Sequence, residues 1–372
     1  MRFLHTADWH IGKKLHAYSL QAEQEAAFQQ ILKLAQQYQV DAVVVAGDIY
    51  DRALPNEQAV AAVNRMLQTI NLKAKLPLLV ISGNHDSAIR LDTGRPWFKA
   101  TQFYLHTKLA QAFTPIEIKK TQFFLLPYFE PFAAREYFAD PKIHTIAQAM
   151  PKIVQTMQAQ FAPDKQQVLV AHFFAAGSQK SDSETALTVG GLDVVPLTAL
   201  QKFDYVALGH LHNQTALHEP RIKYSGSPLK FSVSEANQQK GVWLVDTDPL
   251  QTQFLPLTPK RDLQELTASF AELTTPTFYN KQDRDAYLAI NLTDTKVIPN
   301  VMQTLRQIYP HIISLTRKNG RDVAPTQVKK IRRLAPEALL SDFFKETTGQ
   351  ALTTQQEKWA TSALKAARKE DK

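Results

Sequence analysis

The sequence contains no cysteine among its 372 residues. Without thiols the chain cannot form disulfide bonds, a zinc site with Cys ligands or a cysteine nucleophile. The absence is compatible with a reducing compartment, and we expect a cytoplasmic protein.

Long apolar runs are also missing. No stretch of about 18 apolar residues occurs, so we expect no membrane-spanning helix. The N-terminus enters a strand directly, and we expect no signal peptide. Hydrophobic residues make up 44% of the chain and charged residues 21%, which is ordinary for a globular protein with room for two domains.

The positive charge is concentrated near the C-terminus. The formal net charge is +8, and residues 317–372 contain 13 Lys or Arg against 7 Asp or Glu. One interpretation is a solvated helical face, and the other is a contact with a phosphate backbone or a partner protein. The sequence leaves both open.

Apolar segments that end in Asp, Asn or His are the most informative feature. The run Val43–Val45 predicts a buried strand, and Gly47-Asp48 follows it. Ligands of open α/β sheets bind at the carboxyl ends of the strands. Four more apolar segments run into metal-competent residues, namely Asp8-Trp9-His10, Asn84-His85, His172 and His210-Leu211-His212.

The order of the predicted elements favours a layered α/β fold with two packed sheets and helices outside. Expected strands are 2–7, 42–45, 78–81, 123–126, 168–172 and 205–209, and expected helices are 21–38, one after Asn56, and 145–161. We expect Ser19 to cap the first helix, and Val60, Val63, Leu67 and Ile70 to form the apolar face of the second. Strands at 224–225, 242–245 and 252–257 predict an antiparallel region.

Three parts are expected along the chain, with a boundary near Pro256 and Pro259. Residues 1–257 would form the main domain. Residues 258–335 would form a smaller α+β domain, with strands at 287–292 and 311–316 and a helix at 299–308. Residues 336–372 would form a helical tail, whose apolar face would comprise Leu339, Leu340, Phe343, Phe344, Trp359 and Leu364.

The strand-end residues suit a site for two divalent metal ions. Carboxylate, amide and imidazole groups bind hard-to-borderline cations. Seven candidate ligands are too many for one ion but suit two that share a carboxylate: Asp8, His10, Asp48, Asn84, His172, His210 and His212. Such a pair can clamp a phosphoryl group during in-line displacement. His85 need not be a ligand, and could stabilise the transition state or assist the leaving oxygen.

Each candidate also has a simpler interpretation. Asp48 after a glycine could belong to a turn, and Asn84 could cap a helix. His172 alone could be a hydrogen-bonded core histidine. Five strand ends with the same property favour one joint site. The remaining histidines have no such partners and are assigned structural roles: His5, His16, His106, His144, His218 and His311.

Together these motifs resemble the calcineurin-like metallophosphoesterases. The resemblance covers roughly the first 215 residues and implies a four-layer α/β/β/α sandwich. It implies that one metal ion is held by Asp8, His10, Asp48 and His212, and the other by Asp48, Asn84, His172 and His210. Asp48 would bridge the two ions, His85 would face the scissile phosphate, and Asp51 would orient His85. Mn²⁺ is the usual ion in the nuclease branch.

Other segments distinguish the branches of this family. Ala53 and Asp86 depart from the Ser/Thr phosphatase pattern, where Gly and Glu are expected. The segments 5–13, 190–193 and 224–242 resemble the nuclease subunits of bacterial SbcCD complexes. This resemblance implies DNA as substrate, cutting at duplex ends and in single strands or hairpins, and a role in DNA repair and recombination at the nucleoid.

The same resemblance implies partners. They are an SbcC-type coiled-coil ATPase that docks on the tail, and a second copy of this chain, which together give a heterotetramer. The alternative for the tail is packing on its own smaller domain. Candidates for phosphate contacts are Lys13, Lys14, Arg52, Arg90 and Lys230, although for any single one solvated surface charge is the favoured interpretation.

Three classes of function therefore remain distinct. The first is a DNA nuclease that works with an ATPase. The second is a phosphatase or cyclic-nucleotide phosphodiesterase with the same dimetal site. The third is a binding scaffold with a decayed site, which the complete ligand set disfavours.

Overall fold

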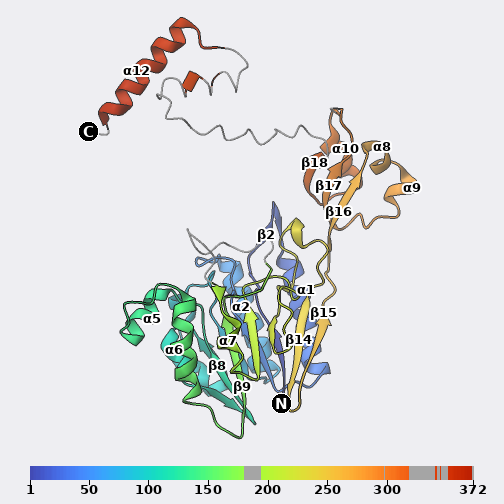
Figure 1. The fold of residues 1–372 in the computed structure, drawn as a ribbon. Coiled ribbons are helices and arrows are strands. Elements are labelled where there is room, and N and C mark those ends of the chain that lie inside the picture. The colour runs from blue at the N-terminus through green and yellow to red at the C-terminus, as the bar shows by residue number, and fades with distance from the viewer. Residues whose placement is uncertain (180–193, 297, 318–339, 342–343, 345–350, 371–372) are drawn as a thin grey trace. The chain divides into compact units, whose positions relative to one another are not determined.

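The computed structural model describes residues 1–179, 194–296, 298–317, 340–341, 344 and 351–370 (Figure 1). The chain divides into two compact units, residues 1–317 and 318–372. The first contains the β-sheets, and helix α12 (Thr354–Glu370) is the main described element of the second. No helix in the described ranges is long and apolar enough to cross a bilayer.

Two mixed sheets form the centre of the first unit. The six-stranded sheet has the order β15 (Leu250–Pro256), β14 (Gly241–Thr247), β1 (Arg2–Thr6), β4 (Ala42–Ala46), β5 (Leu78–Ile81) and β6 (Phe103–His106). The five-stranded sheet has the order β13 (Ile222–Tyr224), β12 (Tyr205–Gly209), β9 (Gln166–His172), β8 (Thr121–Leu125) and β7 (Ile116–Ile118). Two small ribbons accompany them, β2–β3 (Lys14–Leu15, Tyr18–Ser19) and β10–β11 (Phe174–Ala175, Val194–Val195).

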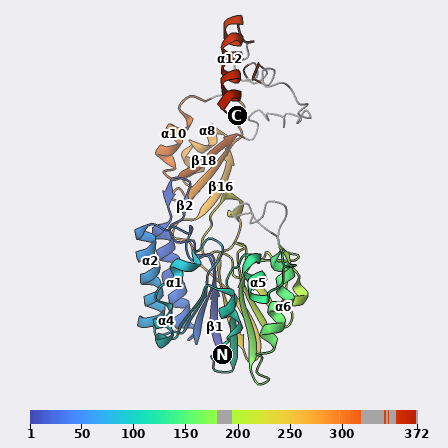
Figure 2. The same ribbon diagram turned by 90° about the vertical axis from the view of Figure 1, so that its left-hand side faces the viewer.

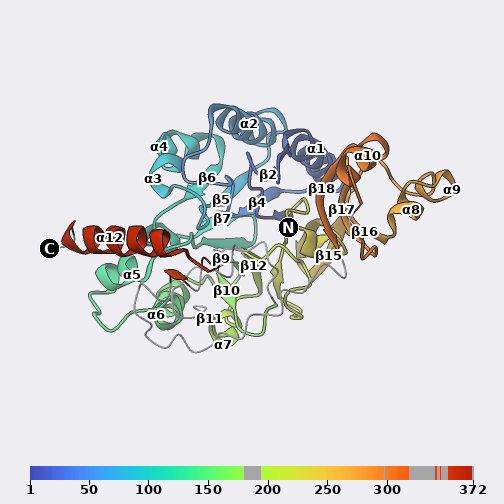
Figure 3. The same ribbon diagram turned by 90° about the horizontal axis from the view of Figure 1, so that it is seen from above.

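Helices cover the outer face of each sheet. Figure 2 shows α1 (Gln21–Gln37), α2 (Glu57–Gln68) and α4 (Arg95–Phe98) beside one sheet, and α5 (Pro131–Phe138) and α6 (Ile146–Gln158) beside the other. The view in Figure 3 shows the same layers end-on, with α7 (Leu197–Leu200) on the side of α6. Short helical turns complete the layers: α3 (Ala88–Leu91), Thr69–Lys73, Lys99–Thr101, Leu109–Phe113 and Val233–Glu235. The expected α/β/β/α arrangement is confirmed.

Three apolar layers hold this sandwich together. One packs the six-stranded sheet on α1 and α2, and another packs the five-stranded sheet on α5 and α6. The third lies between the sheets, where Phe3, Phe123 and Tyr205 meet edge to face with ring centroids 5.3 and 5.9 Å apart. Strand β4 is buried along its whole length, which explains its continuous apolar sequence.

Local signals for the helix starts were only partly correct. Asn56 caps α2 as predicted, accepting from the backbone N–H of Ala59 at 2.8 Å. Ser19 is not the N-cap residue of α1, which is Leu20, but its Oγ accepts from the backbone N–H of Gln21 at 3.4 Å. The prediction that Val60 lies on the apolar face of α2 was also wrong. Val60 is 37% exposed, and α2 buries Ala59, Ala62, Val63 and Met66.

The region after residue 223 is antiparallel only in part. Strand β14 pairs antiparallel with both β1 and β15, as the sequence indicates. Strand β13 instead pairs parallel with β12 and includes Tyr224. The sequence shows no helix before β13, so the parallel pairing of β13 with β12 was not predicted.

A smaller sheet follows residue 262. It consists of β16 (Leu263–Ala268), β17 (Tyr287–Leu292) and β18 (Ile312–Arg317), all parallel, with α8 (Phe270–Leu273), α9 (Pro276–Tyr279) and α10 (Val301–Ile308) in the connections. One face packs its own core around Leu305 and Tyr309. On the other face, Leu263 and Tyr287 belong to the cluster that contains α1. The sequence predicted β17, β18 and α10 but not β16.

The layer between the sheets gives a stability prediction. Phe123→Ala should lower the free energy of unfolding by about 3–5 kcal/mol, because it leaves a cavity beside Phe3 in a layer with no solvent access. Urea unfolding followed by circular dichroism measures the change. Phe132→Ala is the matched control, since Phe132 is 56% exposed, and an equal loss in both variants would contradict the prediction.

Candidate dimetal active site

The loops that follow five strands converge at one end of the sandwich. Strands β1, β4 and β5 are parallel neighbours in one sheet, as are β9 and β12 in the other. Backbone hydrogen bonds join the first two loops, from Asp8 N to the carbonyl of Gly47 and from His10 N to the carbonyl of Asp48, both 3.0 Å. The strand-end residues are therefore brought together as expected.

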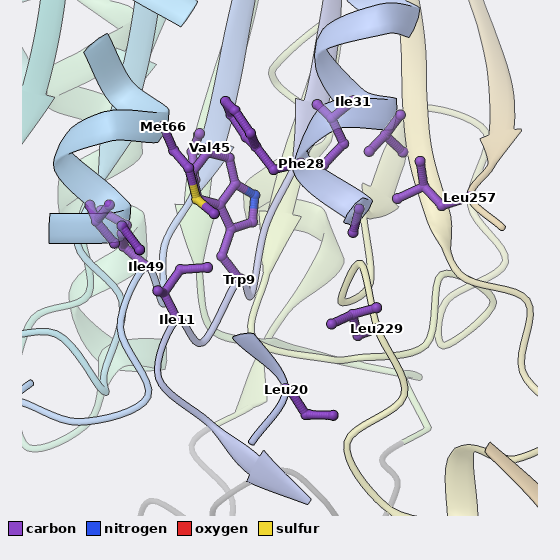
Figure 4. Close-up of a cluster of buried hydrophobic side chains, with 14 of the residues drawn as sticks. Trp9, Ile11, Leu20, Phe28, Ile31, Val45, Ile49, Met66, Leu229 and Leu257 are labelled. Atoms are coloured by element: carbon purple, nitrogen blue, oxygen red, sulfur yellow. The ribbon is translucent and has the colours of Figure 1, made fainter. Parts of the chain in front are cut away.

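Alternation in the first loop separates ligand candidates from core residues. Trp9 and Ile11 enter the apolar layer under α1 and α2, where Figure 4 shows them among Phe28, Val45 and Met66. The Trp9 indole donates to Thr6 Oγ1 at 3.0 Å and meets Phe28 edge to face. Because these anchors are fixed, the intervening side chain of His10 is fixed as well.

Four ligand candidates lie on left-handed backbone. The φ angles are +52° at Asp8, +43° at His10, +50° at Asp48 and +96° at His210. Such conformations cost free energy in residues with a side chain and persist only where the surroundings enforce them. Here the two sheets enforce them, and the result is a set of side chains aimed at one point.

Two groups of ligand atoms share Asp48. In the first, His10 Nε2 lies 3.2 Å from His212 Nε2, and the ligand atoms of Asp8, His10 and His212 lie within 4.8 Å of one another. Asp48 Oδ2 lies 3.6 Å from His10 Nε2 and 3.4 Å from His172 Nε2. Asp48 thus reaches one imidazole of each metal set that the family resemblance implies.

The second group is centred on Asn84. Its Oδ1 lies 2.9 Å from His172 Nε2 and 3.1 Å from His210 Nδ1. The other ring nitrogen of His172, Nδ1, faces the carbonyl of Ala46 at 2.8 Å and donates to it. This bond fixes the tautomer in which Nε2 carries the lone pair that faces the site.

The donor set fits divalent cations. Within the described ranges, Asp8 Oδ2 is buried without a hydrogen-bond partner, a costly state unless another ligand completes it. Two carboxylates, an amide oxygen and four imidazoles suit hard-to-borderline ions. The seven candidates Asp8, His10, Asp48, Asn84, His172, His210 and His212 could hold two such ions.

His85 and Asp51 lie beside this cluster. His85 N donates to Asp48 Oδ1 at 2.8 Å, and its ring is 4.8 Å from that of His10. His85 Nδ1 faces the backbone carbonyl of Asp51 at 2.9 Å. The Asp51 carboxylate instead pairs with Lys13 at 2.8 Å and Arg52 at 3.4 Å. Asp51 therefore contacts His85 through its backbone carbonyl.

Comparisons with known proteins assign the family. The model for the calcineurin-like phosphoesterases matches residues 1–214, and the model described as the type 5 capsule protein repressor C-terminal domain matches residues 259–348. The SbcD subunit of the nuclease SbcCD from Staphylococcus epidermidis is 33% identical over 359 residues, covering 95% of both chains. This chain belongs to the SbcD family of calcineurin-like phosphoesterases. It is accordingly a phosphodiesterase that depends on divalent metal ions.

Solved structures show a more distant similarity. A phosphoesterase from E. coli aligns with a TM-score of 0.30 and 16% identity, covering 67% of this chain and 90% of that one. A dimetal phosphatase from Danio rerio aligns with a TM-score of 0.41 and 11% identity, covering 70% and 99%. Both scores are below 0.5, so the family assignment rests on the sequence matches.

Burial and charge shift the proton affinities in this SbcD-family site. Burial raises the pKa of Asp8 to about 7. Burial opposes ionisation of Asp48, but the imidazoles of His172 and His10 outweigh it and lower its pKa. Burial lowers the pKa of His172, yet Asp48 and Asp8 outweigh that effect and raise it to about 9. Burial and the neighbouring His172 lower the pKa of His210 to about 3.

Several residues that shape the site were missed from the sequence. The carboxylate of Asp86 is half-buried and accepts from the backbone N–H groups of Ile49, Tyr50 and Gly83 at 2.9–3.1 Å. It thereby joins the loops after β4 and β5. Gln24 Nε2 donates to the His10 carbonyl at 2.7 Å. The sequence offered no signal for Gln24. Asp86 could have been singled out, because it directly follows the candidates Asn84 and His85.

Glu235 and Lys240 were also missed, although they lie in a segment that carried the resemblance. Glu235 Oε1 is 3.2 Å from His212 Nδ1, and Lys240 pairs with the same carboxylate at 2.5 Å. No apolar strand precedes Glu235, so the strand-end criterion could not find it.

Two glycines are required by close approach. A Cβ on Gly83 would lie 2.2 Å from Asp48 Oδ1, and a Cβ on Gly47 would lie 2.4 Å from His172 Nδ1. Gly47 also has a φ of +89°. Any side chain at either position would displace a ligand candidate.

The remaining sequence candidates lie elsewhere or are engaged. Lys230 pairs with Asp262 at 2.8 Å and donates to the carbonyl of Ala236, so the protein itself uses this charge. His5 is fully buried between Tyr205 Oη and the Leu208 carbonyl, which is the structural role expected of it. Segment 190–193 lies outside the described residues.

The pKa shifts predict a pH dependence of metal binding. Ligands must lose their protons to bind a cation. The raised pKa values of Asp8, about 7, and His172, about 9, keep these two groups protonated at lower pH. Mn²⁺ affinity should therefore fall as the pH decreases from about 8 to about 6.

Isothermal titration in two buffers of different ionisation enthalpy measures both the affinity and the protons released. We expect net proton release near neutral pH. Constant affinity without proton release would contradict the assignment of these residues as ligands.

Proposed function

We propose that this chain is a Mn²⁺-dependent DNA nuclease that cuts duplex ends, single strands and hairpins. The observation that carries the proposal is a full-length relative, named as the SbcD subunit of the nuclease SbcCD, that is 33% identical across 95% of both chains. The geometry supports it, since Asp48 Oδ2 lies between His10 and His172 in a buried donor set for two cations.

In this proposal the protein holds the metal ions and orients the phosphodiester. Asp8, His10, Asp48 and His212 would hold one ion, and Asp48, Asn84, His172 and His210 the other. Divalent ions at these positions supply positive charge for the phosphoryl oxygens and make a water molecule more acidic. The left-handed backbone at four of the ligands keeps their side chains in place before substrate arrives.

His85 is the proposed catalytic side chain. Its Nδ1 faces the Asp51 carbonyl and its backbone N–H donates to Asp48. Nε2 is then the atom through which His85 would exchange a proton with the leaving oxygen. Asp51 acts as a positioning residue through its carbonyl, and the exposed cations Lys14, Arg52 and Arg90 are the remaining candidates for contacts to phosphate.

We further propose an SbcC-type coiled-coil ATPase as the partner of the tail. Helix α12 begins with a capping box between Thr353 and Gln356. Trp359 is 64% exposed and Leu340 is 37% exposed, and the surrounding segment is basic. Phe344 is half-buried, whereas Leu339, Phe343 and the side chain of Leu364 lie outside the described residues.

Cleavage of a labelled hairpin-ended duplex tests the function. With Mn²⁺ we expect the wild type to cut the duplex. His85→Ala should lower the cleavage rate at least about 100-fold, because proton transfer is lost. Asp48→Ala should not cut at all. His144→Ala is the matched control, since His144 is exposed and outside the site. EDTA should abolish the activity. The assay is run with and without the ATPase partner.

The alternative function is a phosphatase or cyclic-nucleotide phosphodiesterase. If the duplex stays intact under all conditions while a generic aryl phosphate ester is hydrolysed, the dimetal site stands and the nuclease proposal fails.

A second copy of the chain is the proposed partner of an apolar groove. The groove has a volume of about 680 Å³ and is lined from α2, α3 and α4, with Val60, Leu67 and Trp97 among its residues. Nearby, Ile89 is 81% exposed, Trp97 76% and Leu72 54%. Exposed apolar patches of this kind mark interaction sites. Association here would place two active sites on one particle.

Trp97→Glu should convert a dimer into a monomer, because it buries a charge in the interface. Size-exclusion chromatography with light scattering measures the mass. Phe132→Glu is the control, since it also places a charge at an exposed aromatic position. A monomeric wild type, or an unchanged dimer in Trp97→Glu, would refute this interface.

A further inference from the structure

A buried ion pair holds both the ring and the backbone of His212. His212 Nδ1 is 3.2 Å from Glu235 Oε1, and Glu235 Oε2 is 2.5 Å from Lys240 Nζ. Lys240 Nζ also donates to the backbone carbonyl of His212 at 2.8 Å. The Glu235 side chain is fully buried and that of Lys240 is 6% exposed. The three residues form a closed ring of contacts.

The surroundings of Lys240 replace its water shell. Besides Glu235 and His212, its ammonium group donates to Ser227 Oγ at 3.0 Å and to Gln238 Oε1 at 2.9 Å. The carbonyl of Lys240 accepts from Leu257 N, and Gly241 begins strand β14, which pairs with β1. The pair is thus fixed by the sheet that carries Asp8 and His10.

Stability alone is a poor reason for such a pair. Removing two charges from water is costly, and well-packed apolar residues often stabilise a core at least as well. The contacts of this pair are directed at one side chain of the active site, which indicates a role in its geometry.

We infer that Glu235 and Lys240 are positioning residues for His212. Glu235 accepts a hydrogen bond from Nδ1–H, and this fixes the tautomer in which Nε2 carries the lone pair that faces His10. Lys240 contacts both Glu235 and the His212 carbonyl and so fixes their relative positions. The inference rests on the proposed role of His212 as a metal ligand and is independent of DNA as substrate.

A comparison with the other imidazoles of the site supports this role. His172 donates from Nδ1 to a backbone carbonyl, that of Ala46. His212 is held by a carboxylate instead, and a carboxylate makes a ligating imidazole more basic. Glu235 would therefore contribute to metal affinity at the ion bound by His212 and leave the ion bound by His172 and His210 unaffected.

Two double variants isolate the hydrogen bond to Nδ1. Glu235→Leu with Lys240→Met removes both charges and the acceptor, so no buried charge is left unpaired. Glu235→Gln with Lys240→Met also removes both charges but keeps an oxygen that can accept from Nδ1. Mn²⁺ titration by calorimetry and electron paramagnetic resonance should show one of two sites weakened about 10- to 100-fold in the Leu variant and by a smaller factor in the Gln variant.

Other outcomes separate the possible failures. Equal Mn²⁺ affinity in the Leu and Gln variants overturns the inference. Asp48→Ala should weaken both sites, and two unchanged sites in that variant would refute the metal assignment itself. Glu23→Gln with Arg261→Met is the matched control, because it neutralises another ion pair, 2.8 Å apart, with Glu23 buried and Arg261 half-buried, that does not contact His212. Two unchanged Mn²⁺ sites are expected there, and weakening equal to that of the Leu variant would overturn the inference.

If the Leu variant does not fold, the wild-type protein still provides a test. Nitrogen-15 NMR of the histidine rings reports which nitrogen of each ring carries the proton. We expect His212 to be protonated at Nδ1, both with and without Mn²⁺. A His212 ring that is protonated only at Nε2 would overturn the inference.

Discussion

The burial of the Asp48 carboxylate among imidazoles is the constraint on which the rest of the site depends. One oxygen accepts from His85 N, and the other lies within 3.6 Å of both His10 and His172. An anion in this position needs positive charge nearby. Gly47 and Gly83 leave room for this arrangement. A Cβ on Gly83 would overlap the Asp48 carboxylate, and a Cβ on Gly47 would overlap the His172 ring. Strand β4 delivers Asp48 to this position from the middle of the sheet.

The two sheets contribute unequal parts to this arrangement. The six-stranded sheet supplies Asp8, His10, Asp48 and Asn84, and the five-stranded sheet supplies three imidazoles. Carboxylates therefore come from one sheet, and most neutral donors come from the other. The apolar layer between the sheets fixes their distance, so packing far from the chemistry sets the separation of the ligand atoms.

Contacts around the site also lead toward the smaller sheet. Lys240, which holds His212, accepts a backbone hydrogen bond from Leu257 just before the connection to β16. Glu23 precedes Gln24, which holds the His10 carbonyl, and pairs with Arg261 while accepting from Tyr287 Oη. These links join the metal-site loops to residues 257–287 by hydrogen bonds and ion pairs, and both links are buried or half-buried.

The sequence by itself determined the fold class, the family and the set of seven ligand candidates, because buried parallel strands have a distinct apolar pattern and end where ligands bind. It could not assign partners that are distant along the chain. Folding alone brings these partners together. Asp86 accepts from three backbone N–H groups, and Asp51 contacts His85 through its carbonyl. Glu235 and Lys240 hold His212. Helical periodicity likewise failed for Val60, since tertiary packing decides which face of a helix is covered.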